Sequence, residues 1–296
     1  MIRVTEEILR QWAEPASDSE ENRCDRTINS IKSCISAFDF GALGMPDVIL
    51  RGSYKNNTNV RRDSDVDMYA LFDKFSFSCN SYFKPLPVTG NPGPNYNEFK
   101  NTIYKCLQEK YGYSDVSKGR KSIKIKSNNY RVDADVVPVT KLFYYSNYGS
   151  SEVKGVAFFS SNGEFIVNFP CQDNDNGCTK NNNTNHRYKH MVRIFKRFRN
   201  ELENNKQISS HISSYVIESL LYNVPDNYFN EGSYINMLIN IVHYLYQLID
   251  ITRFSEVNRI KEMFRPDLFP EQTNTRIEVK EYLGTIFRCA LEERAA

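Results

Sequence analysis

The segment Leu50–Phe72, LRGSYKNNTNVRRDSDVDMYALF, joins a Gly-Ser turn to a pair of aspartates. The apolar residues before the turn predict a strand over 47–53, and the alternating residues 65–72 predict a second strand that pairs with it. A polar loop connects the two. Because side chains alternate along a strand, Asp65 and Asp67 leave the second strand on the same face, with Val66 and Met68 on the other.

A second pair of aspartates lies further along the chain, in YRVDADVVPV over 130–139. Asp133 and Asp135 again share one face of a predicted strand. Neighbouring carboxylates repel one another and are more easily accommodated around a cation such as Mg²⁺. If the two strands lie side by side, three carboxylates could hold two divalent ions about 4 Å apart, the arrangement that drives phosphoryl transfer. Either pair alone is more typical of a solvated strand edge.

The Gly-Ser turn has a use beside such a site. Glycine lets the backbone of residue 52 approach a phosphate closely. Backbone N–H groups and the Ser53 hydroxyl can then bind phosphate oxygens. Alone, a Gly-Ser pair indicates nothing, but followed by Asp-x-Asp and a later strand aspartate it favours a nucleotide site.

The composition limits the function classes. The chain has 296 residues, 40% hydrophobic and 25% charged, with a net charge of +2. The near-neutral charge favours small charged ligands and argues against a grip on long nucleic acid. No apolar run is long enough for a membrane span, and the first residues do not read as a secretory signal. Seven scattered cysteines fit a reducing cytoplasm, and a monomer is expected.

The remaining pattern divides the chain into an α+β front half and a helical back half. Ser17 and Glu20 predict a capping box at the start of a helix that reaches Phe38. Further strands are predicted on both sides of 127–129 and near 142–147, 154–159 and 164–169. Polar, turn-rich loops are predicted over 84–97 and 170–185. Helices are predicted over 5–13, 97–111, 186–203, 211–223, 233–252 and 275–293. We therefore expect two domains, 1–170 and 171–296.

The zinc alternative is weak. Cys171 and Cys178 lie near His186 and His190, but the gap between the cysteines lacks the short spacing of a zinc site. Loop or buried thiols are the more ordinary interpretation.

The motifs resemble the nucleotidyltransferase superfamily that includes DNA polymerase β. Within it, GSYKNNTNVRRDSDVDM, DVVP, YKHMVRIFKRFRNEL and ISSYVIESLLYNVP are similar to the bacterial CD-NTases, relatives of cyclic GMP-AMP synthase and 2′-5′-oligoadenylate synthetase. The resemblance covers the chain to about residue 225. It implies a polymerase β-like core, a mixed sheet with helices, packed against an all-helical C-terminal lobe with the active site in the cleft between them.

The resemblance also implies roles in the front half. Gly52 and Ser53 would bind the donor triphosphate. Asp65 and Asp67 would ligate two Mg²⁺ or Mn²⁺ ions. Asp135 would ligate the catalytic ion and help to activate the attacking hydroxyl, with Asp133 as the alternative third carboxylate.

Five further residues are candidates for binding the nucleotide. Arg193 and Lys196 lie on the polar stripe of a predicted helix and would reach phosphates, although a solvated basic face is the common reason for such a stripe. Ser214 would contact the triphosphate, and Tyr215 would stack on the donor base unless it is an ordinary core aromatic. Asn168, in VNFP, would favour uracil unless it only ends a strand.

The resemblance implies a cyclic dinucleotide synthase that uses ATP and UTP, with GTP and CTP as further candidates. Its product would contain a pyrimidine and would activate a downstream effector in bacterial defence against phage, the CBASS arrangement. Two alternatives stay open: a nucleotidyltransferase that tails RNA or modifies a protein or small molecule, and a non-catalytic module that binds nucleotide or RNA. DNA activation is not implied.

Overall fold

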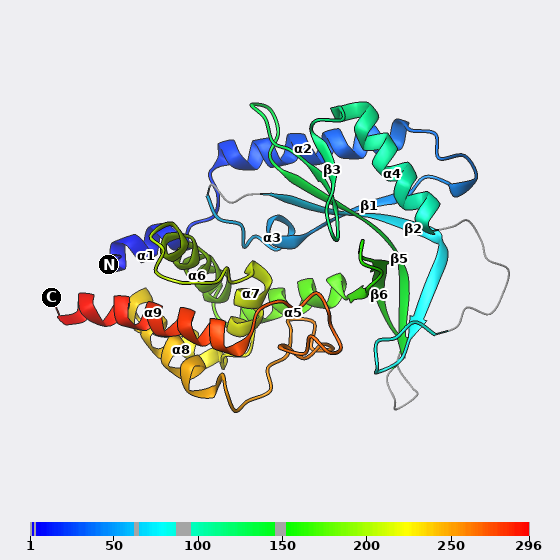
Figure 1. Cartoon of the computed structure of the whole chain (residues 1–296). Helices are drawn as coiled ribbons and strands as arrows, with labels where there is room; N and C mark the ends of the chain where they lie inside the picture. The colour runs from blue at the N-terminus through cyan, green and yellow to red at the C-terminus, as the bar shows by residue number, and fades with distance from the viewer. Residues whose placement is uncertain (1, 3, 62–64, 87–95, 146–151, 296) are drawn as a thin grey trace. The chain divides into compact units, whose positions relative to one another are not determined.

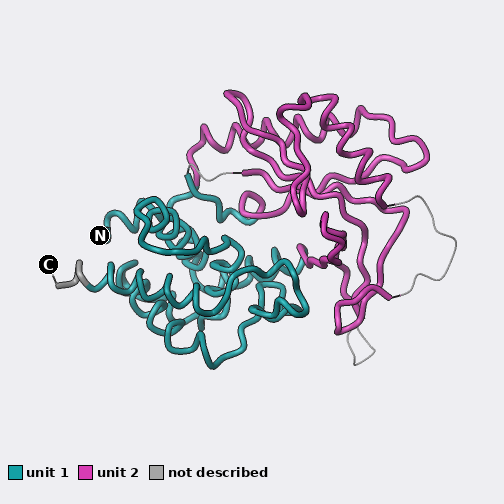
Figure 2. The backbone as a smooth tube through the Cα atoms, viewed as in Figure 1, with its two compact units in different colours: residues 1–15, 56–62, 171–296 teal, residues 16–55, 63–170 magenta. Residues whose placement is uncertain are grey.

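The computed structural model describes residues 2, 4–61, 65–86, 96–145 and 152–295. The chain forms two compact units (Figure 2). The sheet unit contains Ala16–Lys55 and Asp63–Pro170, and the helical unit contains Met1–Pro15, Asn56–Arg62 and Cys171–Ala296. Each unit is built around its own hydrophobic core.

The sheet unit is built on a mixed sheet with strand order β1-β2-β5-β4-β3, in which β6 pairs with β5 and β7 with β6. Among the described strands, β2 and β5 run parallel to each other and the remaining pairings are antiparallel. The elements are α2 (Asp18–Ala37), η1 (Gly41–Leu43), β1 (Asp47–Arg51), α3 (Gly52–Lys55), β2 (Val66–Cys79), α4 (Tyr96–Tyr111), β3 (Val116–Lys118), β4 (Ile123–Ile125), β5 (Ala134–Tyr145), β6 (Glu152–Phe159) and β7 (Phe165–Asn168).

Helices α2 and α4 lie side by side on one face of this sheet (Figure 1). Their apolar stripes, such as Ile31 on α2 and Phe99 on α4, pack in one core with Val66 and Met68 of β2. Strand alternation explains this arrangement, because the even-numbered residues at the start of β2 point toward the helices. The odd-numbered Asp67 therefore leaves the sheet on the opposite face.

The helical unit packs its helices around α6. The core contains residues from α1, α6, α7, α8 and α9, and Trp12 of α1 meets Phe198 of α6 edge-to-face at 5.0 Å. The helices are α1 (Glu6–Ala13), α5 (Pro170–Asn183), α6 (Arg187–Asn204), α7 (Ser214–Tyr222), η2 (Asp226–Phe229), α8 (Tyr234–Leu248) and α9 (Arg276–Ala295). None of the described helices has the length and apolarity to cross a bilayer.

Two expectations differ from the structure. Residues 170–185 were expected to form a loop, yet most of them form α5. Its polar side chains work inside the unit: the buried Lys180 donates to the carbonyl of Val224 at 2.7 Å, and Asn181 accepts from the backbone N–H of Lys189 at 3.1 Å. Side-chain hydrogen bonds of this kind offset the low helix propensity of an Asn- and Asp-rich segment.

The second difference concerns the domain boundary. Residues 1–15 and 56–62 were assigned to the front domain, but both segments pack with the helical unit. Leu9 and Ala13 are buried in the helical core, and Thr58 is fully buried. Their partners lie far away in the sequence, so a change in local composition could not reveal them.

The capping box is present, with the backbone N–H of Ser17 donating to the Glu20 carboxylate at 3.2 Å. The loop expected over 84–97 lies partly outside the described residues, since 87–95 are not among them.

Candidate active site

Strand register brings the predicted carboxylates together. Asp67 on β2 lies directly opposite Asp135 on the parallel strand β5. Asp65 precedes β2 and shares the face of Asp67 by alternation. Asp133 lies outside β5 and is exposed, and its carboxylate accepts the backbone N–H of Ser127 at 2.6 Å. Asp135, rather than Asp133, therefore lies next to Asp67 in the sheet.

Gly52 lies against the same carboxylate. Its φ of +72° is in the left-handed region, and a Cβ atom built on it would lie 2.1 Å from Asp67 Oδ2 and 2.9 Å from Asp67 Cβ. A side chain at residue 52 would overlap the Asp67 side chain unless that side chain moved, so glycine suits both the backbone angle and the close contact. Ser53 follows in the single turn of α3, directly after the end of β1. The Gly-Ser pair and Asp67 are thus in direct contact across the paired strands β1 and β2.

Arg51 contacts the candidate carboxylates, which the sequence did not predict. It pairs with Asp67 in the β1–β2 register, and its Nη2 lies 3.1 Å from Asp67 Oδ1. Its guanidinium carbon lies 4.7 Å from the centre of the Tyr69 ring. Burial by itself lowers the pKa of Arg51, but Asp67, Asp135 and Asp65 outweigh burial and raise it. The guanidinium therefore neutralises part of a concentrated negative charge.

The acids also affect one another. Burial raises the pKa of Asp135 above its ordinary value, and the nearby charge of Asp67 raises it further. Like charges that close together need a cation, and an all-oxygen donor set suits Mg²⁺ or Mn²⁺. No three His, Cys, Asp or Glu side chains of the described residues converge tightly enough to hold an ion as they stand. The donor chemistry fits a divalent metal, provided that the Arg51–Asp67 pair opens.

Asn168 is placed at the end of β7, where it pairs with Val156 of β6. Its Nδ2 donates to the hydroxyl of Tyr69 at 3.1 Å. Tyr69 follows Asp67 by two positions on β2, so both side chains leave the strand on the same face. Asn168 is therefore connected to the carboxylates through two residues, Tyr69 and Arg51, that the sequence did not single out.

In the helical unit, Ser214 and Tyr215 occupy the first turn of α7. The Ser214 hydroxyl accepts from Nη1 of the buried Arg199 at 3.0 Å. The side chain of the N-cap residue, Ser213, makes no capping hydrogen bond. The helix thus begins without a side-chain cap, a feature that suits anion binding when a phosphate is near.

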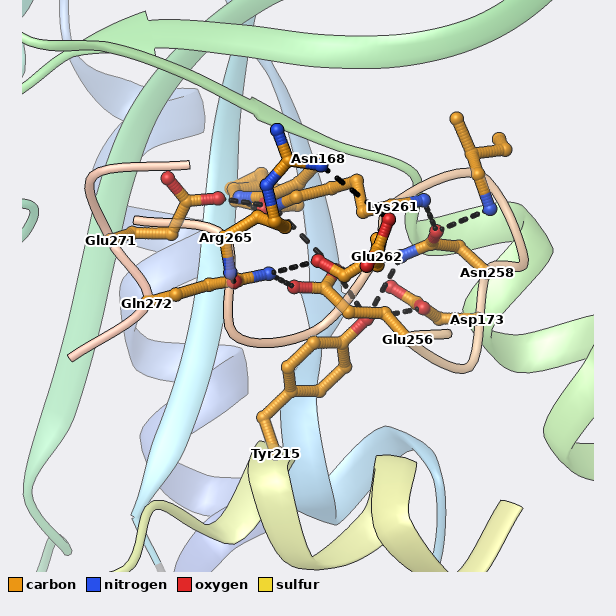
Figure 3. Close-up of polar contacts among 12 residues, drawn as sticks. Asn168, Asp173, Tyr215, Glu256, Asn258, Lys261, Glu262, Arg265, Glu271 and Gln272 are labelled. Carbon is orange, nitrogen blue, oxygen red and sulfur yellow. Dashed lines mark hydrogen bonds and ion pairs between the residues drawn. The ribbon is translucent and has the colours of Figure 1, made fainter. Parts of the chain in front are cut away.

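Tyr215 is held by its hydroxyl (Figure 3). It donates to Asp173 at 2.7 Å, and Asn258 Nδ2 donates to it at 3.0 Å. Burial raises the pKa of Asp173 to about 7, and the charge of Glu256 contributes. The sequence suggested no role for the last 70 residues, yet Asn258 and Glu256 come from them. The residues around Asn258 show neither helical nor strand periodicity, so the sequence could not predict their contact with Tyr215.

A buried lysine also holds the segment that contains Glu256 and Asn258. Lys261 is 2% exposed and lies between Glu256, at 3.5 Å, and Glu271. Gln272 donates to Glu256 at 2.7 Å (Figure 3). These contacts fix the position of Glu256 and Asn258, and thereby of the polar groups that bind the Tyr215 hydroxyl.

Arg193 and Lys196 are engaged inside the helical unit. Arg193 donates to the carbonyls of Ala13 at 2.6 Å and Asn57 at 2.7 Å, and burial lowers its pKa to about 10. Lys196 is 2% exposed and donates to the carbonyl of Thr58 at 3.1 Å, with Glu218 at 3.9 Å. Both side chains bind the backbone of the segment at Asn57 and Thr58, and their contact with phosphate stays a prediction. The spacing of basic residues along a helix shows that they share one face, but it does not show whether that face is buried.

Comparisons with known proteins assign the chain to a family. The helical region 175–288 matches the C-terminal helical domain of cGAS/DncV-like nucleotidyltransferases. A cyclic dipyrimidine nucleotide synthase, CdnE, from Legionella pneumophila is 35% identical over 95% of this chain and 96% of its own. The chain belongs to the CD-NTase family of cGAS/DncV-like nucleotidyltransferases.

Two other CD-NTases extend the comparison. A cyclic dipurine nucleotide synthase from Elizabethkingia meningoseptica is 33% identical over 89% of this chain and 91% of its own. The solved structure of the Rhodothermus marinus CdnE c-UMP-AMP synthase with Apcpp and Upnpp has a TM-score of 0.81 and 28% identity, covering 96% of this chain and 95% of that one. The mixed sheet with a helical C-terminal domain is thus the CD-NTase fold, as expected. Because these relatives include both a dipyrimidine and a dipurine synthase, family membership does not fix the base.

Proposed function

We propose that this CD-NTase joins two nucleoside triphosphates into a cyclic dinucleotide that contains a pyrimidine, such as cyclic UMP-AMP or cyclic di-UMP, with release of pyrophosphate. One observation carries the proposal: Asp67 lies opposite Asp135 in a parallel register, with Gly52 packed against Asp67. Support for the base comes from the Legionella and Rhodothermus relatives, which are named for pyrimidine-containing products.

Asp65, Asp67 and Asp135 would hold two Mg²⁺ or Mn²⁺ ions. When bound, these ions neutralise the triphosphate and lower the pKa of the attacking hydroxyl. Before they bind, Arg51 shields Asp67 at 3.1 Å. Asp135 would ligate the catalytic ion and help to activate the attacking hydroxyl.

The phosphates and the donor base would be held by short-range contacts. Gly52 allows the backbone to approach the triphosphate, and Ser53 adds a hydroxyl donor. Ser214 and the first turn of α7 would bind phosphate oxygens. Tyr215 would stack on the donor base, with its ring held by the hydrogen bond to Asp173 at 2.7 Å.

Asn168 would read the edge of a pyrimidine. A carboxamide offers one donor side and one acceptor side, which suits the N3–H and O4 of uracil. ATP and UTP would then be substrates, with GTP and CTP as further candidates. The product would activate an effector in bacterial anti-phage (CBASS) signalling inside the cytoplasm.

The test is incubation with all four NTPs and Mg²⁺ or Mn²⁺, followed by phosphatase treatment and mass spectrometry. We expect a phosphatase-resistant cyclic product that contains uracil and is absent in the Asp65→Ala/Asp67→Ala variant. A linear RNA extension would favour tailing activity instead. Nucleotide binding without turnover, unchanged in the double variant, would favour a binding module.

A further inference from the structure

Two cysteines meet between the helices α2 and α4. Cys34 lies in the last turn of α2 and Cys106 in the second half of α4. Their sulfur atoms lie 3.5 Å apart, although 72 positions separate the two residues in the sequence. Each cysteine continues the apolar stripe of its helix, three positions after Ile31 and Ile103 respectively. The thiols are therefore brought together by the packing of the two helices on the sheet (Figure 1).

The backbones of the two helices are close at this point. Cys34 Sγ lies 3.6 Å from the carbonyl oxygen of Cys106, and Cys106 Sγ lies 3.7 Å from the carbonyl oxygen of Cys34. A second contact between the same helices, Ser30 Oγ to the Tyr111 hydroxyl at 2.8 Å, lies close by. Because an S–S bond is about 2.05 Å long, the sulfur atoms need to approach by about 1.5 Å, which small rotations of both side chains can supply.

The two thiols differ in exposure and in acidity. Cys106 is 1% exposed, whereas Cys34 is partly exposed. The hydrogen bond with Cys106 and the charge of Lys110 lower the pKa of the Cys34 thiol, against the opposing effects of burial and Glu109. The same hydrogen bond and burial raise the pKa of Cys106. Because the thiolate is the nucleophile, an oxidant reaches and reacts with Cys34 first.

We propose that Cys34 and Cys106 form a modification site, a dithiol that a hydroperoxide converts into a disulfide that ties α2 to α4 and stabilises the sheet unit. Cys106 packs in the same core as Val66 and Met68, on the face of the sheet opposite Asp67. The modification is therefore separate from the candidate carboxylates and does not rest on the proposed function.

The oxidation takes two steps. The Cys34 thiolate attacks one oxygen of the hydroperoxide, so that an S–O bond forms and the O–O bond breaks, and the second oxygen takes a proton and leaves as an alcohol or water. The Cys106 sulfur then attacks the Cys34 sulfur, so that an S–S bond forms and the S–O bond breaks, and the hydroxyl leaves with the Cys106 proton as water. Two electrons pass from the dithiol to the peroxide. A reducing thiol restores both cysteines by exchange.

The test treats the folded, full-length protein with hydrogen peroxide, blocks the remaining thiols and maps the tryptic peptides by mass spectrometry. Cleavage after lysine and arginine places Cys34 in the peptide 33–51 and Cys106 in the peptide 106–110, each without a second cysteine. We expect these two peptides to be joined by a bond that a reducing thiol breaks. Peptides that stay separate, or that join other cysteines instead, would overturn the proposal.

Single variants test the order of attack. In Cys106→Ala, Cys34 should stop at the sulfenic acid, which a 1,3-diketone reagent labels. In Cys34→Ala, the buried Cys106 should stay reduced. Cys24→Ala is the matched control, because Cys24 is another cysteine of α2 and burial raises its pKa to about 11. The control should form the disulfide as the parent does, and oxidation of Cys106 in the absence of Cys34 would contradict the assigned roles.

The effect on stability is measured by unfolding the reduced and the oxidised protein in urea. A disulfide that closes a loop of this length should raise the urea midpoint of the sheet unit by roughly 1 M. Cys106→Ala, treated with peroxide in the same way, should show no such rise. A midpoint that stays the same or falls when the disulfide forms would refute the stabilising role. These measurements read the bond and the fold, so they hold whether or not the protein forms a cyclic dinucleotide.

Discussion

Replacing Gly52 by alanine tests the contact that joins the Gly-Ser turn to the carboxylates. The new Cβ atom would lie 2.1 Å from Asp67 Oδ2, well inside contact distance. The carboxylate must move by about 1 Å to relieve this overlap, and a displacement of that size at a reacting centre can reduce turnover by about 100-fold. The φ of +72° adds about 1–2 kcal/mol of strain for any residue with a Cβ atom.

Gly112 provides the matched control, because it combines a φ of +89° with no atoms within 4 Å of a built Cβ. Gly112→Ala should lose the same 1–2 kcal/mol or so of stability through strain alone and keep its turnover. The assay is initial-rate formation of the cyclic product, alongside unfolding in urea. The reasoning is refuted if Gly52→Ala keeps turnover to within about threefold of the parent, or if both variants lose turnover equally.

Three further predictions follow from the described contacts. Asp135→Asn should reduce turnover by at least about 100-fold, whereas Asp133→Asn should keep most of it; equal losses in initial-rate assays would contradict our choice of third carboxylate. Burial raises the folded-state pKa of Asp173 to about 7, so the folded state binds this proton more tightly than the unfolded state does. Stability should therefore fall as pH rises from about 4 to 7, by on the order of 2–4 kcal/mol, and Asp173→Asn should flatten that slope in urea titrations. Lys196→Met should destabilise the protein by about 3–5 kcal/mol because Glu218 loses its buried partner, and adding Glu218→Leu should restore much of the loss; an exposed lysine would show neither effect.

The sequence predicted the carboxylates well because their placement depends on local rules. Alternation put Asp65 and Asp67 on one face and Asp133 and Asp135 on one face, but that the two acidic strands lie side by side came only from the structure. The choice between Asp133 and Asp135 needed the register, which depends on the pairing of whole strands. The Gly-Ser turn was recognised, but its contact with Asp67 was not, because a Cβ clash is a property of three dimensions.

Contacts that depend on distant partners were not predicted from the sequence. Arg51 looks like an ordinary strand end until it is paired with Asp67, and Tyr69 looks like a core aromatic until Asn168 lies beside its hydroxyl. Arg193 and Lys196 have the periodicity of a solvated stripe, yet they donate to carbonyls more than a hundred positions away. Helix α5 was hidden by its polar composition, since its stabilising contacts are side-chain hydrogen bonds rather than apolar packing.

The path of the chain between its two units has a consequence for engineering. The segment Asn56–Arg62 belongs to the helical unit although it interrupts the sequence of the sheet unit. A gene cut after residue 170 would therefore produce a helical fragment without α1 and without the backbone that Arg193 and Lys196 bind. A chimera that places this helical unit in another CD-NTase should transfer three segments together: residues 1–15, 56–62 and 171–296. If residues 171–296 were transferred alone, the buried Arg193 and Lys196 would face the other protein's residues in place of 1–15 and 56–62.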